Sequence, residues 1–286
     1  MIVITGASGQ LGRLVIASLL TKVSASELVA VVRNPEKASD IAALGVQVRQ
    51  ADYNQADDWH RALQGASKVL LISSNELGQR TEQHRNVINA AKNAGVALLA
   101  YTSILHADTS VLELAAEHRA TEADIRTSGV PFVMLRNGWY TENYTLGIAT
   151  ALVLGAVYGC AGDGLIASAA RADYAEAAAV VLTSDNQAGK TYELAGDTAY
   201  TLSEFAAEIS LQSGKAIGYI NLAESDYKQA LLNAGLPEPL AQLLADSDSG
   251  AAKGALFDTS RQLSRLIGRP TASLATAVKV QLPNAK

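Results

Sequence analysis

The first half of the sequence repeats one pattern, and this pattern limits what the chain can fold into. A helical run ends in glycine and a short apolar run follows at once, as after Gly45, Gly65, Gly95 and Gly129. A glycine just past a helix end adopts the left-handed conformation without a clash from a Cβ atom. The repeat therefore predicts that helices and strands alternate along this part of the chain.

The apolar runs also indicate how the strands are arranged. Several of them are apolar at every position, which is typical of parallel strands that helices cover on both faces. We therefore predict an α/β fold with a doubly wound parallel sheet. Six strands are expected before residue 140, at residues 2–4, 29–32, 46–48, 69–72, 98–101 and 130–135.

Beyond residue 135 the alternation becomes irregular. We expect residues 1–140 to form the sheet domain, and residues 141–286 to form a smaller mixed α/β segment that completes the sheet and caps its ligand edge. Strands are predicted there at residues 156–160, 191–195 and 216–220. Helices are predicted at residues 172–183, 202–213, 225–234 and 237–245.

Composition excludes several kinds of partner and compartment. The net charge of −5 argues against nucleic acid, which binds to clustered Lys and Arg. The single cysteine, Cys160, can form neither an internal disulfide nor a thiolate metal site, so we expect no metal and a reducing compartment. The uncharged stretch at 143–162 contains four glycines, which favours a helix, turn and strand over a membrane span. No secretory signal pattern precedes the first strand, and we expect a cytoplasmic protein.

A glycine-rich loop follows the first predicted strand. Gly6, Gly9 and Gly12 are spaced G-x-x-G-x-x-G and open a helix with apolar residues at 11, 14, 15 and 19. Such glycines let the backbone turn tightly, let a pyrophosphate approach it, and let the helix pack close to the strand. The helix N-terminus then offers unpaired N–H groups to the phosphates. We interpret this loop as a dinucleotide-binding site, rather than as a simple tight turn.

The end of the second strand indicates which dinucleotide binds. An NAD site usually places an acidic residue there for the ribose 2′-hydroxyl, but this chain has Arg33. A guanidinium suits a 2′-phosphate, so NADP is the predicted cofactor, the alternative being a solvated charge at a strand end. Asn34 and Pro35 read as the N-cap and first residue of a helix beside it. Asp52, past the third strand, would either contact the adenine or form a turn.

Several stretches resemble the NmrA-like group of atypical short-chain dehydrogenases, and in particular its bacterial NAD(P)H:quinone oxidoreductases. They are residues 4–12, 33–35, 89–96, 105–110, 135–143, 192–197 and 266–270. The resemblance implies reduction of quinones to hydroquinones by NADPH through two-electron hydride transfer, without flavin or metal. A dye-decolourising triphenylmethane reductase is a more distant relative of the same build.

The resemblance also implies where the cofactor binds. Position in the predicted fold supports part of this set, because α/β sheets bind ligands at the carboxyl ends of their strands. The small hydroxyl residues there would otherwise cap helices. The implied cofactor contacts are Gly6, Ala7, Ser8, Gly9, Gln10, Leu11, Arg33, Ser73, Ser74, Asn75, Asn137, Gly138, Trp139, Tyr140, Thr141, Glu142, Ser168, Ala169, Ala170, Arg171, Ala172 and Asp173.

One catalytic feature of short-chain dehydrogenases is missing. Most of them use a Tyr-x-x-x-Lys pair to move a proton, but none of the ten tyrosines here has lysine four residues on. Alignment with the family places His118 at the lysine position, so His118 is the candidate proton source, or else a histidine that packs within the helix. His106 and Tyr140 are the candidate substrate contacts, with solvent exposure as the alternative for His106. His60 and His84 are expected to be structural.

The leading hypothesis is an NADPH-dependent quinone reductase. A quinone accepts a hydride readily, and water can protonate the hydroquinone oxygens, so the missing pair is no obstacle. Two alternatives stay open: a non-catalytic NADP(H)-sensing regulator of the NmrA type, and a reductase of dyes or other planar electrophiles. The sequence predicts no oligomeric state.

Overall fold

The computed structural model describes residues 1–282 and divides them into two compact units. The first consists of residues 1–107, 116–137 and 171–193, and the second of 108–115, 138–170 and the described residues from 194 onward. The two units interleave along the chain, since residues 171–193 return to the first. The predicted domain division at residue 140 follows sequence order and stays a prediction.

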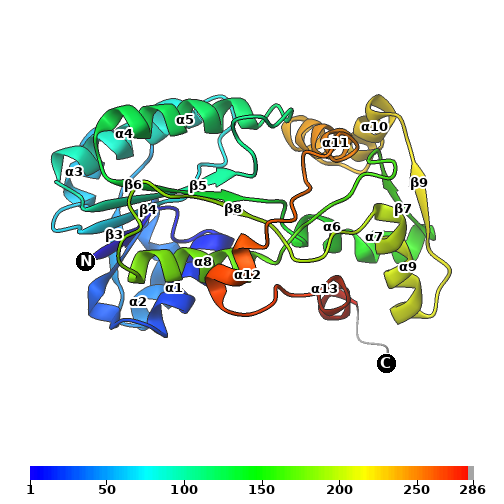
Figure 1. The fold of residues 1–286 in the computed structure, drawn as a ribbon, viewed down its shortest axis with the longest axis horizontal. Coiled ribbons are helices and arrows are strands. Elements are labelled where there is room, and N and C mark those ends of the chain that lie inside the picture. The colour runs from blue at the N-terminus through cyan, green and yellow to red at the C-terminus, as the bar shows by residue number, and fades with distance from the viewer. Residues whose placement is uncertain (283–286) are drawn as a thin grey trace. The chain divides into compact units, whose positions relative to one another are not determined.

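The first unit is built on a seven-stranded sheet of order β3-β2-β1-β4-β5-β6-β8 (Figure 1). The strands β1 to β6 pair in parallel. Backbone N–H groups of Met134 and Gly138 donate to the carbonyls of Lys190 and Leu194, which joins β8 to β6. The predicted doubly wound sheet is thus confirmed. Its strands are β1 (Ile2–Ile4), β2 (Leu28–Val32), β3 (Gln47–Gln50), β4 (Lys68–Leu71), β5 (Leu98–Ile104), β6 (Phe132–Asn137) and β8 (Thr191–Leu194).

Helices cover both faces of this sheet (Figure 1). One face carries α1 (Gln10–Leu20), α2 (Ser39–Ala43) and α8 (Arg171–Thr183), and α1 packs along α8. The other carries α3 (Ala56–Ala62), α4 (Arg80–Asn93) and α5 (Ala115–Ser128), and 3₁₀ turns lie at η1 (Ala25–Glu27) and η2 (Pro35–Ala38). The four glycines that follow helices, Gly45, Gly65, Gly95 and Gly129, all have φ between 65° and 85°. The conformation predicted for them is confirmed.

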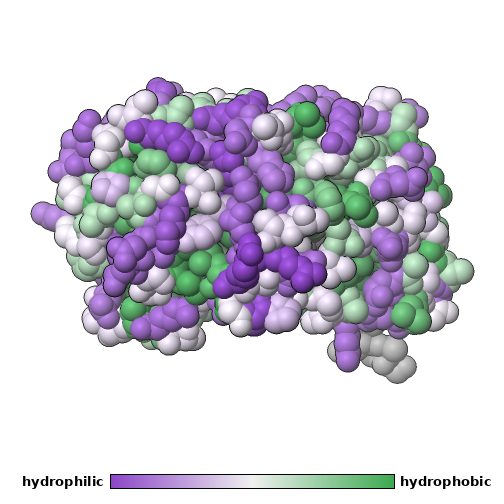
Figure 2. All heavy atoms as spheres, in the orientation of Figure 1, coloured by the Kyte–Doolittle hydropathy of each residue, from purple (hydrophilic) through white to green (hydrophobic). Residues whose placement is uncertain are grey.

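The core of the first unit lies on both faces of the sheet, as expected for parallel strands. Alternate residues Val3, Val69 and Leu71 join a buried cluster with Trp59 and Ile88 from α3 and α4. Their neighbours Ile4 and Leu70 are equally buried against the other face. Hydrophilic residues cover much of the surface drawn in Figure 2, with smaller apolar areas between them.

The second unit contains a two-stranded parallel sheet, β7 (Ala156–Gly159) with β9 (Gly218–Asn221). The helices and strands predicted beyond residue 135 are confirmed, with α8 and β8 in the first unit and the others in the second. Helix α10 packs on α11. No helix within the described residues is long and apolar enough to cross a membrane. The helices of this unit are α6 (Glu142–Thr145), α7 (Ile148–Leu154), α9 (Leu202–Ser213), α10 (Glu224–Asn233), α11 (Glu238–Ala251), α12 (Gln262–Ile267) and α13 (Leu274–Gln281).

Candidate cofactor and substrate site

The glycine loop has the close backbone approach that a dinucleotide needs. Gly6 lies in the turn just after β1 and has a φ of +57°, a value that suits glycine. A Cβ atom on Gly12 would lie 2.6 Å from the carbonyl oxygen of Gly6, so the first turn of α1 packs directly on the loop. No side chain caps this helix and its first turn holds no acidic residue. The N–H groups there are therefore open to an anion.

A closed ring of hydrogen bonds ties this loop to the end of β4. The N–H of Ile72 donates to Thr5 Oγ1 at 2.9 Å, and the phenol of Tyr53 donates to the carbonyl of Ile72 at 2.8 Å. The hydroxyls of Thr5 and Tyr53 lie 2.7 Å apart, so Thr5 donates to Tyr53. Burial raises the pKa of Tyr53, which keeps the phenol protonated and the ring intact. Sequence reasoning did not find Tyr53, because its contact with the loop is purely tertiary.

The structure brings Arg33 together with the predicted loop 73–75. Arg33 directly follows β2, and 71% of its side chain is exposed. Its Nη1 lies 3.1 Å from Oε1 of Glu76, the residue that follows this loop. The N–H of Ser73 donates to Thr102 Oγ1, and the N–H of Ser74 donates to the buried ring of His84, each at 2.9 Å. Hydrogen bonds to residues of α4 and β5 thus fix the loop, while the guanidinium of Arg33 faces solvent.

Asn34 and Asp52 take local structural roles beside Arg33. Asn34 Oδ1 accepts from the N–H of Glu36 at 2.9 Å, which confirms the predicted N-cap, although the helix that follows is a short 3₁₀ turn. Asp52 Oδ1 accepts from the N–H of Asn54 at 2.9 Å. Of the two roles considered for Asp52, the structure shows the turn.

Two further predicted segments meet within the second unit. The N–H of Thr141 donates to the carbonyl of Ala169 at 3.0 Å, and the N–H of Ala169 donates to Trp139 at 3.1 Å. Their side chains continue this link, since Thr141 Oγ1 lies 2.8 Å from Ser168 Oγ, which lies 2.7 Å from the phenol of Tyr200. Segments 138–142 and 168–170 therefore form one hydrogen-bonded patch, and their contact with a cofactor stays a prediction.

Asn137 and α8 supply the remaining predicted contacts in the first unit. Asn137 ends β6, and its Oδ1 is buried without a hydrogen-bond partner among residues 1–282. An orphaned buried acceptor is costly, and a bound ligand that donates to it would remove that cost. Arg171 and Asp173 lie in the first turn of α8. The open glycine loop, the exposed Arg33 and the orphaned Asn137 oxygen all fit a phosphorylated dinucleotide.

His118 lies in a buried polar network between α4, α5 and β5. Its Nδ1 is 2.7 Å from the phenol of Tyr101 and its Nε2 is 3.4 Å from Nη1 of Arg80. Burial and the nearby Arg80 lower the pKa of His118 well below 6.5, so the ring is neutral. His84 is buried in the same region, as expected for a structural histidine. These facts favour the packing role for His118, and its role as a proton source stays a prediction.

His106 and Tyr140 stay predictions as substrate contacts. His106 follows β5 with φ of +51°, and its N–H donates to Glu193 Oε2 at 2.8 Å. Glu193 in turn accepts from Arg136 Nη1 at 2.8 Å. The backbone at His106 is therefore held in a left-handed conformation by a charged residue of β8.

A buried ion pair lies beside this loop and was missed at the sequence level. Nε and Nη2 of Arg136 donate to the two carboxylate oxygens of Glu122 at 2.9 and 2.8 Å, and Ser103 Oγ donates to Oε1 at 2.7 Å. Burial alone raises the pKa of Glu122, but hydrogen bonds from Arg136 and Ser103 outweigh it and lower the pKa. A charged strand residue carries no sequence signal that it is buried.

A buried carboxylate also lies in the second unit. Asp248 on α11 accepts hydrogen bonds from the phenol of Tyr144 at 2.9 Å and from the N–H of Cys160 at 3.1 Å. A Cβ atom on Gly159 would lie 2.6 Å from Asp248 Oδ2, so the carboxylate packs tightly on β7. Burial raises the pKa of Asp248 to about 6, in spite of these hydrogen bonds.

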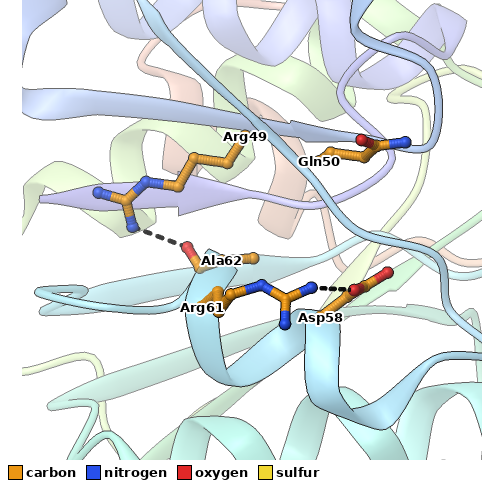
Figure 3. Close-up of a pocket in the computed structure, with 5 residues that line it drawn as sticks. All are labelled: Arg49, Gln50, Asp58, Arg61 and Ala62. Atoms are coloured by element: carbon orange, nitrogen blue, oxygen red, sulfur yellow. Dashed lines mark hydrogen bonds and ion pairs between the residues drawn. The ribbon is translucent and has the colours of Figure 1, made fainter.

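A surface pocket of about 510 Å³ opens between β3 and α3, and its lining residue Gln50 donates a side-chain hydrogen bond to the carbonyl of Arg33 at 3.1 Å. Figure 3 shows Arg49 directed at the carbonyl of Ala62, and Arg61 at Asp58. Gln50 completes the lining, and none of the five residues belongs to the predicted site. Among the described residues, no three His, Cys, Asp or Glu side chains are grouped so that they could hold a metal ion.

Known proteins resemble this chain over its whole length. Quinone oxidoreductase 2 of Escherichia coli (strain K12) is 59% identical over 278 residues, which cover 97% of each chain. A crystal structure of the E. coli NADPH-dependent quinone oxidoreductase with NADPH is 57% identical and has a TM-score of 0.97, covering 99% of this chain and 100% of that one. The triphenylmethane reductase of Citrobacter sp. complexed with NADP(H) is 41% identical, with a TM-score of 0.95 and coverage of 99% and 100%.

A family model gives the same result. The model of the NAD(P)H-binding family matches residues 6–185, from the glycine loop to just beyond α8. The resemblance drawn from the sequence motifs is confirmed by these matches. This chain belongs to the NAD(P)H-binding family.

Proposed function

We propose that the protein reduces quinones to hydroquinones with NADPH, without flavin or metal. The observation that carries the proposal is the 59% identity with E. coli quinone oxidoreductase 2 across 97% of both chains. The glycine loop, Arg33 and the orphaned Asn137 oxygen add local support, since each fits NADPH. NADPH when bound supplies two electrons and a proton as hydride, and a second proton from water completes the hydroquinone.

The residues of the chain would bind and orient the two reactants. The N–H groups at the start of α1 would hold the pyrophosphate, and Arg33 would hold the 2′-phosphate. The patch formed by 138–142 and 168–170 would contact the nicotinamide end, and the ring of Tyr140 offers a face for a planar substrate. His106 would contact the substrate from the loop after β5.

The chemistry needs little from acid–base residues. A quinone is a strong electrophile whose reduced oxygens are protonated by solvent, so orientation and exclusion of water carry the catalysis. The neutral, buried state of His118 agrees with this, because no titrating group is then required. We infer a small planar quinone as substrate, and a cytoplasmic location in which the free thiol of Cys160 remains reduced.

A second candidate is the reduction of dyes by the same hydride transfer. It is favoured by the full-length match with the Citrobacter triphenylmethane reductase, which is complexed with NADP(H). A panel that contains 1,4-benzoquinone, a naphthoquinone and a triphenylmethane dye separates the two, since the preferred acceptor has the higher kcat/KM.

The test is steady-state NADPH oxidation with 1,4-benzoquinone, in the wild type and in Arg33→Ala. Hydrogen bonds to charged groups contribute about 1.5–3 kcal/mol, so KM for NADPH should rise roughly tenfold to a hundredfold in Arg33→Ala while KM for NADH holds. Arg85→Ala, which removes an exposed arginine of α4, is the matched control. NADPH binding without oxidation by any acceptor would instead support a cofactor-sensing protein.

A further inference from the structure

Glu76 lies beside Arg33, the residue that we propose binds the 2′-phosphate. Its Oε1 is 3.1 Å from Nη1 of Arg33, and its Oε2 accepts from Nε2 of Gln83 at 2.7 Å. No other side chain among residues 1–282 pairs with the Arg33 guanidinium. The guanidinium that we propose binds the phosphate dianion is thus already paired with a carboxylate of the same protein.

This carboxylate is fixed in place rather than loosely solvated. Gln83 on α4 is 1% exposed, and its amide nitrogen donates both to Glu76 and to Asn54 Oδ1, the latter at 3.2 Å. The N–H of Glu76 donates to Ser74 Oγ at 3.2 Å, so its backbone is tied to the predicted cofactor loop as well. Only the end of the carboxylate that faces Arg33 is left to act on a ligand.

The pair does little for folding. Arg33 is 71% exposed and Glu76 is 33% exposed, and ion pairs at such sites contribute little to stability because water and salt screen them. Gln83 is buried and positions the Glu76 carboxylate, yet the ion pair that results adds little stability. A role of Glu76 in ligand binding explains this arrangement better than a role in folding. The charge on Glu76 matters most when a second anion approaches the same guanidinium.

We propose that Glu76 sets the cofactor selectivity of the site by sharing Arg33 with the 2′-phosphate. This rests on the proposed NADPH binding. The carboxylate neutralises Arg33 and repels a 2′-phosphate, which weakens NADPH binding. A 2′-hydroxyl carries no charge and can donate to a carboxylate, so NADH is tolerated. The protein prefers NADPH only moderately for this reason, and removal of the charge makes it stricter.

The test is calorimetric titration of Glu76→Gln with two pairs of ligands. NADPH and NADH form one pair, and 2′,5′-ADP and 5′-AMP, which differ only in the 2′-phosphate, form the other. We expect Glu76→Gln to bind NADPH and 2′,5′-ADP roughly five- to tenfold more tightly, as removal of one like charge near the surface implies, and NADH and 5′-AMP no more tightly. Glu82→Gln, an exposed glutamate of α4, controls for the change in net charge.

Arg33→Ala separates this mechanism from simple repulsion. In the Arg33→Ala background, Glu76→Gln should shift the ratio of the two affinities less than it does with Arg33 present, because only direct repulsion remains once the shared guanidinium is gone. An unchanged or smaller preference for the 2′-phosphate in Glu76→Gln alone would overturn the inference, as would an equal gain in both backgrounds. If the wild type binds neither NADPH nor 2′,5′-ADP, the proposed function fails, and this outcome is distinct from the others.

Discussion

Asp248 makes the second unit sensitive to pH in a direction opposite to most carboxylates. Burial raises its pKa from 3.8 to about 6 in the folded protein. Between these values the folded state binds more protons than the unfolded state, so the free energy of unfolding falls as pH rises. Each pKa unit corresponds to about 1.36 kcal/mol, so the loss amounts to about 3 kcal/mol, fully present above about pH 6.

The substitution Asp248→Asn isolates this contribution. The amide oxygen of Asn can accept from the N–H of Cys160, and its NH₂ can donate to the phenol oxygen of Tyr144, so both contacts persist with one reversed. The amide does not ionise, so the free energy of unfolding of the variant should not show the fall that Asp248 causes as pH rises. We expect Asp248→Asn to match the wild type near pH 4 and to exceed it by up to about 3 kcal/mol near pH 7.5.

The assay is urea unfolding over a series of pH values in a Trp59→Phe background. The chain has two tryptophans, and Trp59 belongs to the first unit, so Trp139 then reports on the second unit alone. All other carboxylates are common to both proteins, and the difference in unfolding free energy isolates Asp248. Parallel pH profiles for the two proteins would refute the reasoning.

Two further changes test the packing and the charges of the first unit. Gly12→Ala places a Cβ atom 2.6 Å from the backbone oxygen of Gly6, so it should cost about 1–3 kcal/mol of stability and weaken NADPH binding. Gly218→Ala, a control in the second unit where a Cβ meets nothing within 4 Å, should cost under 1 kcal/mol, roughly the effect of an unstrained site. Urea unfolding of the protein with both tryptophans present measures the two variants. Glu122→Gln leaves Arg136 short of a buried partner and should cost about 3–5 kcal/mol at neutral pH. Because the pKa of Glu122 is lowered, its stabilisation is present above the unfolded pKa and is lost as pH falls through the folded pKa, so the gap between wild type and variant should close in acid.

Local sequence signals predicted the sheet because their physical cause is local. A glycine that must adopt positive φ, as at Gly45 or Gly129, marks a helix end whatever surrounds it. The run at 191–195 is also predicted as a strand, and β8 (Thr191–Leu194) is found there. Its place beside β6 depends on contacts with distant residues, and the interleaving of the units that follows from it has no local signal.

The candidate site divides in the same way. Gly6 and Arg33 are recognisable from the sequence because the residue type and its position at a strand end suffice. Three other features depend on tertiary hydrogen bonds between different elements of the fold. They are the bond from Tyr53 to Ile72, the bond from Gln83 to Glu76, and the ion pair of Arg136 with Glu122. Nothing in the neighbouring residues marks such groups, and only the fold reveals them.

The return of residues 171–193 to the first unit affects how the protein is made. During synthesis β6 is complete at residue 137, but β8 is complete only at residue 194. At the usual rates of translation this interval lasts roughly 3 to 11 seconds. Throughout it the outer edge of β6 has no partner, and until residue 183 the apolar face of α1 lacks the cover of α8. The nascent chain therefore exposes a sheet edge and a hydrophobic helix face at the stage when chaperones act on it.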